Sequence, residues 1–314
     1  MAKYLVTGGA GFIGCNLVRF LLAKGHEVVV LDDFSTGKRE NLTDVAERIE
    51  LIEGDVRDRP TVDRAVAGCE AVFHQAALGS VPRSVEDPIR SHDVNVNGTL
   101  TLLEAVRAAG IKRLIFAASS SAYGNQKESP KHEGMVPAPI SPYAASKVAC
   151  EGYMQAYAGA YGLQTLSLRY FNVFGPHQDP HGAYAAVIPA FIGRILNGQA
   201  PIVFGDGEQS RDFCYIDNVC EANWLAANAD PEVSDGRALN IACGRSTTLN
   251  EMLDLLRGLL ATEVTADYQS ERPGDVKHSL AAIDRARQSI GYEPTIYFEE
   301  GLRRSIDWYR RNLG

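Results

Sequence analysis

Short runs of apolar, often β-branched residues alternate with longer amphipathic segments through the first half of the chain. Segments such as Glu27–Leu31 (EVVVL) are almost continuously apolar, which is typical of parallel strands buried on both faces of a sheet. Strands that alternate with helices in this way predict an α/β fold built on a doubly wound parallel sheet. The predicted strands are Tyr4–Thr7, Glu27–Leu31, Ile49–Ile52, Ala71–His74, Leu114–Ala117 and Thr165–Leu168, and the predicted helices are Ile13–Lys24, Arg57–Val66, Val94–Ala108 and Tyr143–Tyr161.

The alternation loosens after about Tyr170. Residues 172–184 are rich in glycine, proline and histidine, which predicts a loop. Two more helices and one strand are predicted beyond it, at Ala185–Leu196, Asp217–Ala229 and Ala238–Ala242. We therefore expect a main domain at 1–170 and a smaller C-terminal α/β lobe at 171–314. This lobe should pack over the C-terminal edge of the sheet and share segments with the main domain.

One helix of the smaller lobe has a clear start. Thr248 and Glu251 have the spacing of a capping box, in which each side chain binds the backbone N–H of the other residue. The apolar face of the helix that follows carries Leu249, Leu253, Leu256 and Leu260.

Length, composition and charge narrow the class of protein. The chain has 314 residues, 45% hydrophobic and 22% charged, which is typical of a globular protein with a large core. A net charge of −8 argues against nucleic acid or an anionic membrane as the main partner. No apolar run approaches the roughly 20 residues of a membrane span, and the N-terminus lacks a signal-peptide cleavage site. Six scattered cysteines without metal-ligand spacing predict reduced thiols, no metal site and a cytoplasmic protein.

A glycine-rich turn follows the first predicted strand. Gly8, Gly11 and Gly14 are spaced as G-x-x-G-x-x-G and lead directly into a predicted helix. Glycine lets the backbone approach a pyrophosphate, and the N–H groups at the start of the helix bind the anion. The pattern predicts a dinucleotide site in a Rossmann-type domain.

Acidic residues after the next two strands indicate which dinucleotide binds. Asp32 and Asp33 end the second strand, where a carboxylate binds the adenosine ribose and repels a 2′-phosphate. This favours NAD, although the nearby Lys38 and Arg39 leave NADP open. Asp55, after the third strand, is placed for the adenine edge.

Tyr143 and Lys147 form a candidate catalytic pair. They are four residues apart at the start of a predicted helix, so both side chains lie on one face. A nearby ammonium and a cationic nicotinamide ring would favour the phenolate of Tyr143 over the phenol, whose ordinary pKa is about 10. Tyr143 is then a general base toward a substrate alcohol.

Several motifs together resemble the extended short-chain dehydrogenase/reductase family. They are TGGAGFIG at 7–14, Asp32, SSSAYG at 119–124 and SPYAASK at 141–147. The resemblance implies a Ser–Tyr–Lys triad of Ser119, Tyr143 and Lys147, in which Lys147 also holds the cofactor ribose. It further implies that NAD is bound by Gly8, Gly11, Phe12, Ile13, Gly14, Asp32, Asp33, Asp55, Val56, Gln75, Ala76, Ala77, Asn95, Tyr143, Lys147 and Tyr170.

The residues after Ser119 separate reaction types within that family. Dehydratases and decarboxylases resemble one another in carrying acidic residues there, whereas this chain has Ser120 and Ser121. The difference favours epimerisation, in which a hydride is removed and returned. A nucleotide-sugar reductase or dehydratase, and a non-catalytic sensor on the same fold, remain as alternatives.

Motifs along the chain also resemble nucleotide-sugar 4-epimerases, namely NVNGT at 95–99, RYFN at 169–172, RDF at 211–213 and RPGD at 272–275. The resemblance implies that Asn172, Arg211 and Arg272 contact the diphosphate and that Asp275 contacts the uridine ribose. The full set of implied substrate residues is Gly79, Ser80, Ser119, Ser120, Ser121, Asn172, Val187, Phe204, Arg211, Arg272, Asp275 and Ser279.

Three further segments are most similar to bacterial UDP-N-acetylglucosamine 4-epimerases: 77–88, 178–186 and 275–279. In this family a bulky residue at the position of Ser279 excludes an N-acetyl group, whereas serine admits it. The resemblance therefore implies interconversion of UDP-N-acetylglucosamine and UDP-N-acetylgalactosamine, with UDP-glucose and UDP-galactose as further substrates. Acidic sugars stay open, since Arg83 is a nearby cation. The resemblance also implies a homodimer, paired through helices around Asn95–Ala108 and Tyr143–Tyr161.

Overall fold

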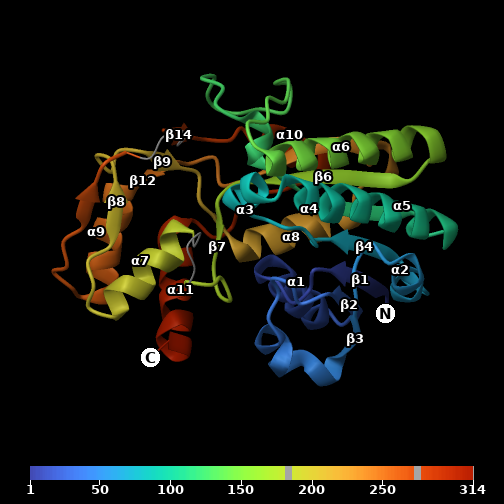
Figure 1. Ribbon diagram of the computed structural model, residues 1–314, viewed down its shortest axis with the longest axis horizontal. Helices are drawn as coiled ribbons and strands as arrows, with labels where there is room; N and C mark the ends of the chain where they lie inside the picture. The colour runs from blue at the N-terminus through green and yellow to red at the C-terminus, as the bar shows by residue number, and fades with distance from the viewer. Residues whose placement is uncertain (181–185, 272–276, 314) are drawn as a thin grey trace.

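The computed structural model describes residues 1–180, 186–271 and 277–313. Its main sheet has seven strands in the order β11-β6-β5-β4-β1-β2-β3 (Figure 1). All neighbouring pairs in this sheet are parallel, which confirms the predicted α/β fold. The strands are β1 (Lys3–Thr7), β2 (Glu27–Asp32), β3 (Ile49–Glu53), β4 (Ala71–His74), β5 (Arg113–Ser119), β6 (Gln164–Tyr170) and β11 (Asp235–Ile241).

Helices cover both faces of the sheet, because successive strand residues point to opposite sides. In β1, Tyr4 and Val6 pack into one core, whereas Leu5 packs into the other. The first core lies under α1 (Phe12–Ala23), α8 (Ile216–Ala227) and the 3₁₀-helix Arg39–Arg48. The second lies under α2 (Arg59–Val66), α5 (Gly98–Ala108) and α6 (Pro142–Tyr161).

Two helices differ from the prediction near their N-terminal ends. The helix predicted from Arg57 is α2, which begins at Arg59 because the Asp58 carboxylate caps it by accepting from Thr61 N at 3.2 Å. The helix predicted at Val94–Ala108 is divided. Residues Asp93–Asn97 form a π-helical turn, and α5 follows from Gly98.

The rest of the chain forms short strands and further helices outside the main sheet. The predicted capping box is confirmed: Glu251 N donates to Thr248 Oγ1 at 3.1 Å, and Thr248 N donates to Glu251 Oε2 at 2.7 Å. The strands of this part are short and pair as β13 (Asp267–Gln269) with β8 (Ile202–Phe204), β10 (Cys214–Tyr215) with β7 (Val173–Phe174), and β12 (Thr247–Thr248) and β14 (His278–Ser279) with β9 (Ser210–Arg211). The remaining helical segments are α3 (Val81–Glu86), α4 (Pro88–His92), Ser120–Tyr123, α7 (Val187–Leu196), Pro231–Val233, α9 (Leu249–Leu260), α10 (Asp284–Ile290) and α11 (Phe298–Leu313).

The second half of the chain also contributes to the main sheet. The strand predicted at Ala238–Ala242 is β11, which pairs with β6, and α8 packs against α1. A boundary at residue 170 therefore cuts through the sheet, and we retain the division into two parts only as a proposal with shared segments. In the described part of the chain, no helix combines the length and apolar character needed to cross a membrane.

Candidate active site

The glycine turn between β1 and α1 brings two stretches of backbone very close together. Gly8 has a φ of +67°, and a Cβ there would lie 2.7 Å from backbone atoms of Ala76. A Cβ on Gly14 would lie 2.1 Å from the carbonyl oxygen of Gly8. Gly11 is the N-cap of α1 and supplies no capping side chain, so the first N–H groups of the helix are available to an anion. This geometry fits a dinucleotide pyrophosphate.

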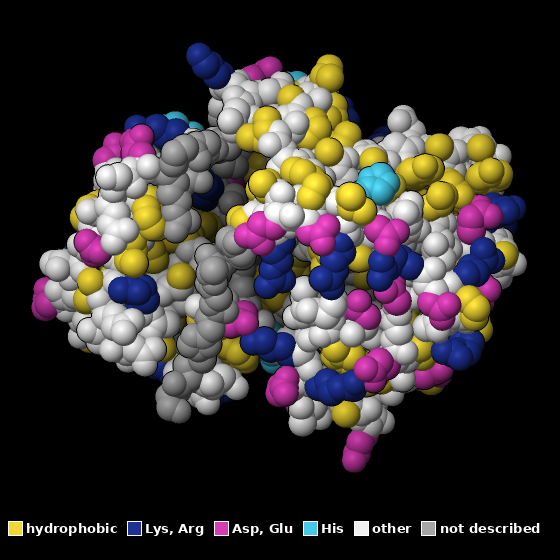
Figure 2. Space-filling model, viewed as in Figure 1, with side chains coloured by type: hydrophobic (Ala, Val, Ile, Leu, Met, Phe, Trp, Pro, Cys, Tyr) yellow, Lys and Arg dark blue, Asp and Glu magenta, His cyan; other side chains and the backbone are white. Residues whose placement is uncertain are grey.

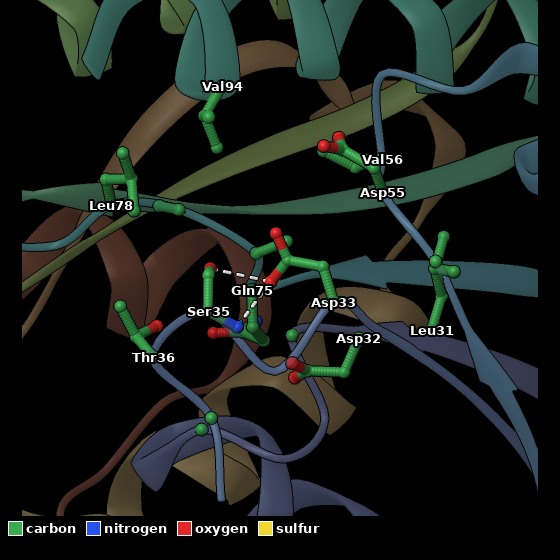
Figure 3. A pocket seen from close by; sticks show the side chains of 16 residues that line it. Leu31, Asp32, Asp33, Ser35, Thr36, Asp55, Val56, Gln75, Leu78 and Val94 are labelled. Carbon is green, nitrogen blue, oxygen red and sulfur yellow. Dashed lines mark hydrogen bonds between the residues drawn. The ribbon is translucent and has the colours of Figure 1, made fainter. Parts of the chain in front are cut away.

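A pocket lies beside this turn, lined by residues at the C-terminal ends of β1, β2, β3 and β4 (Figure 3). Ligands of doubly wound sheets bind at such a point, where the strand order reverses. The pocket has about 550 Å³ of empty space, part of it open to solvent. Nine residues predicted to bind the cofactor line it: Gly8, Gly11, Asp32, Asp33, Asp55, Val56, Gln75, Ala76 and Ala77.

The two aspartates after β2 differ in their surroundings. Asp32 is buried, and its carboxylate accepts from Ala10 N at 2.9 Å and from Phe34 N at 2.8 Å, which fixes the glycine turn. Burial raises the pKa of Asp32 above its ordinary value. Asp33 is exposed and accepts from both N and Oγ of Ser35, at 2.9 and 2.7 Å (Figure 3).

The cations that left NADP open are each paired with a carboxylate. Lys38 Nζ lies 2.6 Å from Asp179 Oδ2, and Arg39 Nη2 lies 2.5 Å from Glu53 Oε2. Both pairs are exposed and weak. A 2′-phosphate would nevertheless have to compete with these carboxylates, which agrees with the preference for NAD.

Asp55 is held by Arg57. The guanidinium binds both oxygens of Asp55, with Nη2 at 2.5 Å from Oδ2, and it also pairs with Asp93 in the π-turn. These hydrogen bonds hold the pKa of Asp55 below its ordinary value. Asp55 is thus a carboxylate at the end of the pocket where adenine is expected.

Tyr143 is positioned at the first turn of α6. Ser141 caps this helix by accepting from Ala144 N at 3.1 Å, and Pro142 favours the helical start. The backbone N–H of Tyr143 donates to Ser84 Oγ at 3.0 Å, which ties the turn to α3. The Tyr143 side chain lies beside that of Ser119, at the end of β5, and Ser119 lowers the pKa of the phenol.

Lys147 lies one turn further along α6 and is buried. Its Nζ donates to the carbonyl oxygen of Ala117 at 2.8 Å and lies 5.9 Å from the centroid of the Tyr143 ring. Burial lowers the pKa of Lys147 to about 8. The structure therefore brings Ser119, Tyr143 and Lys147 together from two elements.

The expected effect of Lys147 on Tyr143 is not seen in the chain alone. Burial raises the pKa of Tyr143 above its ordinary value, and the Ser119 side chain opposes this rise. The Lys147 ammonium donates to a backbone carbonyl and lies 5.9 Å from the centroid of the phenol ring.

The other predicted cofactor residues lie around the pocket rather than in its lining. Phe12, Ile13 and Gly14 form the first turn of α1, and Asn95 is buried in the π-turn. The hydroxyl of Tyr170 lies 3.2 Å from Gln75 Nε2 and 2.8 Å from Asn223 Nδ2. Tyr170 thus supports the wall of the pocket that Gln75 lines.

Three of the predicted substrate residues come together around β9. Arg211 lies in this strand and is in parallel register with Ser279 of β14. Asn172 joins them, because its Nδ2 donates to the carbonyl oxygen of Asp212 at 3.1 Å. Asp212 is buried and accepts backbone N–H groups from Cys243, Gly244 and Ala281, while burial raises its pKa to about 6.

The remaining predicted substrate residues are spread along several elements. Gly79 and Ser80 precede α3, which Ser80 caps by accepting from Arg83 N at 3.3 Å. Ser121 donates its hydroxyl to Ser119 Oγ at 2.8 Å, and Ser120 begins the same 3₁₀ turn. Val187 starts α7, and Phe204 ends β8. Arg272 and Asp275 lie outside the described residues.

Several residues of the site were not predicted. Leu31, Ser35, Thr36, Gly37, Gly54, Leu78 and Val94 also line the pocket. The Ser-Thr-Gly run after Asp33 was a readable loop signal, and a Cβ on Gly37 would lie 2.8 Å from Asp32 Oδ1. No local sequence pattern identifies Ser84, Leu78 or Val94 as part of the site, because their roles depend on packing between distant segments.

Comparison with known proteins agrees with this geometry. Residues 4–242 match the family model described as the NAD dependent epimerase/dehydratase family. The chain belongs to this family. A UDP-glucose 4-epimerase of Mycolicibacterium smegmatis is 37% identical to it over 317 residues, covering 98% of each chain.

Two solved structures are similar to this family member over nearly its whole length. A UDP-N-acetylglucosamine 4-epimerase from Methanobrevibacter ruminantium, in complex with UDP-N-acetylmuramic acid, is 41% identical, with a TM-score of 0.94 over 99% of both chains. A UDP-glucose 4-epimerase from Thermus thermophilus, in complex with NAD, is 39% identical, with a TM-score of 0.88 over 98% of this chain and 99% of that chain. Family membership confirms the expected cofactor and class: the protein is an NAD-dependent epimerase.

Proposed function

We propose that the protein is a UDP-hexose 4-epimerase that interconverts UDP-N-acetylglucosamine and UDP-N-acetylgalactosamine, and also UDP-glucose and UDP-galactose. The observation that carries the proposal is the placement of Tyr143 beside Ser119, which lowers the pKa of the phenol, with Lys147 Nζ 5.9 Å from the centroid of the phenol ring. Ser120 and Ser121, which follow Ser119, provide no carboxylate for elimination. The chain therefore has the groups for moving a proton and a hydride, and lacks an acid at this place in the motif.

Each residue of the site has a distinct role in the proposed reaction. When bound, NAD supplies the hydride acceptor and a positively charged ring that favours an ionised phenol beside it. Tyr143 takes the proton from the O4 hydroxyl of the sugar, and Ser119 orients that hydroxyl by a hydrogen bond. Lys147 keeps a positive charge close to Tyr143 and the cofactor ribose. Tyr143 returns the proton after the 4-keto sugar has presented its opposite face.

The nucleotide diphosphate is proposed to lie across β9. Arg211 offers paired donors that suit phosphate oxygens, and Asn172 is held beside it through the Asp212 carbonyl. By resemblance, Arg272 joins them on the diphosphate and Asp275 binds the uridine ribose. A fixed nucleotide and a freely turning sugar are what this reaction requires.

The size of Ser279 supports an N-acetylated sugar. Ser279 is in register with Arg211, so a substituent at this position lies near the proposed diphosphate site. A small side chain permits the larger sugar without selecting it, since one extra group in a pocket is worth only about 1–3 kcal/mol. UDP-glucuronate and UDP-galacturonate are the second candidates, because Arg83 is close to the catalytic helix through α3.

The proposal is tested by incubating the purified protein, without added cofactor, with UDP-N-acetylglucosamine, UDP-glucose or UDP-glucuronate. NMR should detect the 4-epimer at unchanged mass, and the relative rates define the preferred sugar. A dehydratase would lower the product mass by one water molecule, and a reductase would consume added NADH. Either result would replace epimerisation while leaving the NAD site intact.

We further propose a cytoplasmic homodimer. All six cysteines are buried free thiols, as in proteins of reducing compartments.

Exposed apolar side chains gather over α3, α4 and α6 (Figure 2), among them Val85 at 64% and Ile89 at 81% exposure. The outer face of α6 carries small residues such as Ala145, Ala149 and Gly152, which allow a second helix to approach closely. Light scattering of the wild type and of Ile89→Asp tests this interface, since only the variant should be monomeric.

A further inference from the structure

A histidine at the end of β4 connects the wall of the cofactor pocket with the catalytic helix. His74 is 1% exposed and lies between two threonine hydroxyls. Its Nδ1 is 2.7 Å from Oγ1 of Thr7, the last residue of β1, and its Nε2 is 2.9 Å from Oγ1 of Thr99 in α5. The mechanism described above uses none of these three residues.

The direction of each hydrogen bond follows from counting protons. Thr99 has one hydroxyl proton and donates it to the carbonyl oxygen of Asn95 at 2.5 Å. Its oxygen can therefore only accept from His74, which places the imidazole proton on Nε2. His74 is neutral, because burial and the nearby Lys147 charge lower its pKa to about 3. Its Nδ1 is then an acceptor, and the Thr7 hydroxyl must donate to it.

One end of this series of hydrogen bonds contacts the wall of the cofactor pocket. With its proton given to His74, Thr7 Oγ1 accepts from Ala76 N at 3.3 Å. Ala76 lines the pocket, and its backbone leaves no room for a Cβ on Gly8, where the closest approach would be 2.7 Å. The hydroxyl of Thr7 therefore sets where Ala76 lies against the glycine turn.

The other end holds the catalytic helix. The backbone carbonyl oxygen of Asn95 accepts from Thr99 Oγ1, and the side-chain Nδ2 of Asn95 donates to Ser146 Oγ at 3.0 Å. Ser146 donates its own hydroxyl to the carbonyl oxygen of Tyr143 at 2.7 Å. Asn95 lies in the π-turn, a distortion that is frequent at functional sites.

We propose that His74, as the Nε2–H tautomer, is a positioning residue that couples the cofactor pocket to the helix carrying Tyr143. Its Nδ1 arm, through Thr7, fixes Ala76 and the glycine turn. Its Nε2 arm, through Thr99 and Asn95, fixes Tyr143 relative to Ser119. The inference rests on the proposed role of Tyr143 in epimerisation, whereas the assignment of the His74 tautomer does not depend on that role.

The tautomer is tested directly by ¹⁵N NMR of the imidazole in the NAD-bound protein. The His74 signals are assigned by their absence from the His74→Gln variant. We expect a neutral ring with the proton on Nε2, unchanged between about pH 6 and about pH 9. A proton on Nδ1, or titration within this range, would overturn the proposal whether or not the protein is an epimerase.

Two substitutions separate the arms, because the amide of asparagine reaches about as far as Nδ1 and that of glutamine about as far as Nε2. His74→Asn should keep the Thr7 arm, so NAD is retained while kcat falls on the order of fivefold at unchanged KM. His74→Gln should keep the Thr99 arm, so labelled NAD is lost on the order of fivefold faster in a chase while kcat with NAD in excess is preserved.

Single-arm variants provide matched controls. Thr99→Val should reproduce the kcat loss of His74→Asn, and Thr7→Val should reproduce the faster NAD loss of His74→Gln. Thermal unfolding is measured for all four. If every variant shows both a lower kcat and faster loss of NAD, each in proportion to its loss of stability, His74 has a purely structural role and the proposal is overturned.

Discussion

The phenol of Tyr143 lies beside Ser119, close enough for Ser119 to lower its pKa, although Tyr143 opens helix α6 and Ser119 ends strand β5. Two separate anchors bring them together. Ser84 accepts the backbone N–H of Tyr143 at 3.0 Å, and Lys147 donates to Ala117, two residues before Ser119, at 2.8 Å. The register of helix against strand is therefore fixed on both sides of the phenol, as an oriented proton acceptor requires.

Replacing Tyr143 by phenylalanine should remove catalysis and spare the cofactor. General acid–base groups contribute roughly 10²–10⁴-fold, so Tyr143→Phe should lower kcat at least about a hundredfold. Bound NAD should stay at the wild-type level, because the glycine turn and Asp55 are untouched. Epimer formation is followed by NMR and NAD by absorbance after denaturation. Tyr153→Phe, on the exposed face of the same helix, should behave as wild type; normal turnover by Tyr143→Phe would contradict the assignment.

Lys147 should make stability depend on pH in a specific direction. Its pKa is lowered by burial to about 8 in the folded protein, against an ordinary value of 10.5, so the unfolded chain binds more protons between these values. Stability from this group therefore rises as the pH increases from about 8 to about 10.5, by up to about 3 kcal/mol. Lys147→Met should lack this rise.

The measurement is the free energy of unfolding in urea at about pH 7.5 and about pH 9.5, within the window of that lowered pKa. Other groups also titrate there, so the difference between wild type and Lys147→Met is the quantity of interest. The exposed Lys112→Met should match the wild type. Parallel pH profiles for wild type and Lys147→Met would mean that Lys147 is not a desolvated ammonium.

The sequence predicted the parts of this fold that depend on local pattern. The continuous apolar run of β2 and the glycine turn after β1 were readable, because burial on both faces and close backbone approach each demand particular residues. The position of β11 beside β6 was not readable, since nothing in Ala238–Ala242 identifies its neighbour. The sequence predicts ordinary helix from Val94 through most of the π-turn at Asp93–Asn97, because the apolar spacing there hardly differs from that of α5.

The same distinction applies to the site. The residue types at Tyr143, Lys147 and Ser119 indicated a triad, and the structure brings them together. The raised pKa of Tyr143 could not be foreseen, because it depends on how far the fold buries the phenol. His74 looked like any buried strand residue, and only its two threonine neighbours reveal its orientation.

The glycine turn should tolerate no side chain at Gly14. A methyl group there would lie 2.1 Å from the Gly8 carbonyl oxygen, which is backbone and cannot move aside cheaply. Gly14→Ala should therefore lose bound NAD and destabilise the protein by about 1–3 kcal/mol or more. Gly258→Ala in α9 is the matched control, since a Cβ there meets nothing within 4 Å. It should be neutral or stabilising by up to about 1 kcal/mol; equal behaviour of the two variants would contradict this account.

The choice of sugar should depend on the volume at position 279. Ser279 is in register with Arg211, which we propose to bind the diphosphate, so a larger side chain would take space from the sugar attached to it. Ser279→Tyr should lower kcat/KM for UDP-N-acetylglucosamine roughly 10- to 200-fold while changing that for UDP-glucose much less. Ser279→Ala, which removes the hydroxyl without adding volume, should leave the ratio of the two values near that of the wild type. If Ser279→Tyr lowers both values equally, the side chain does not lie beside the N-acetyl group. In that case the selection between sugars is made elsewhere in the pocket, and the loop at Gly79 and Ser80 is the next place to test.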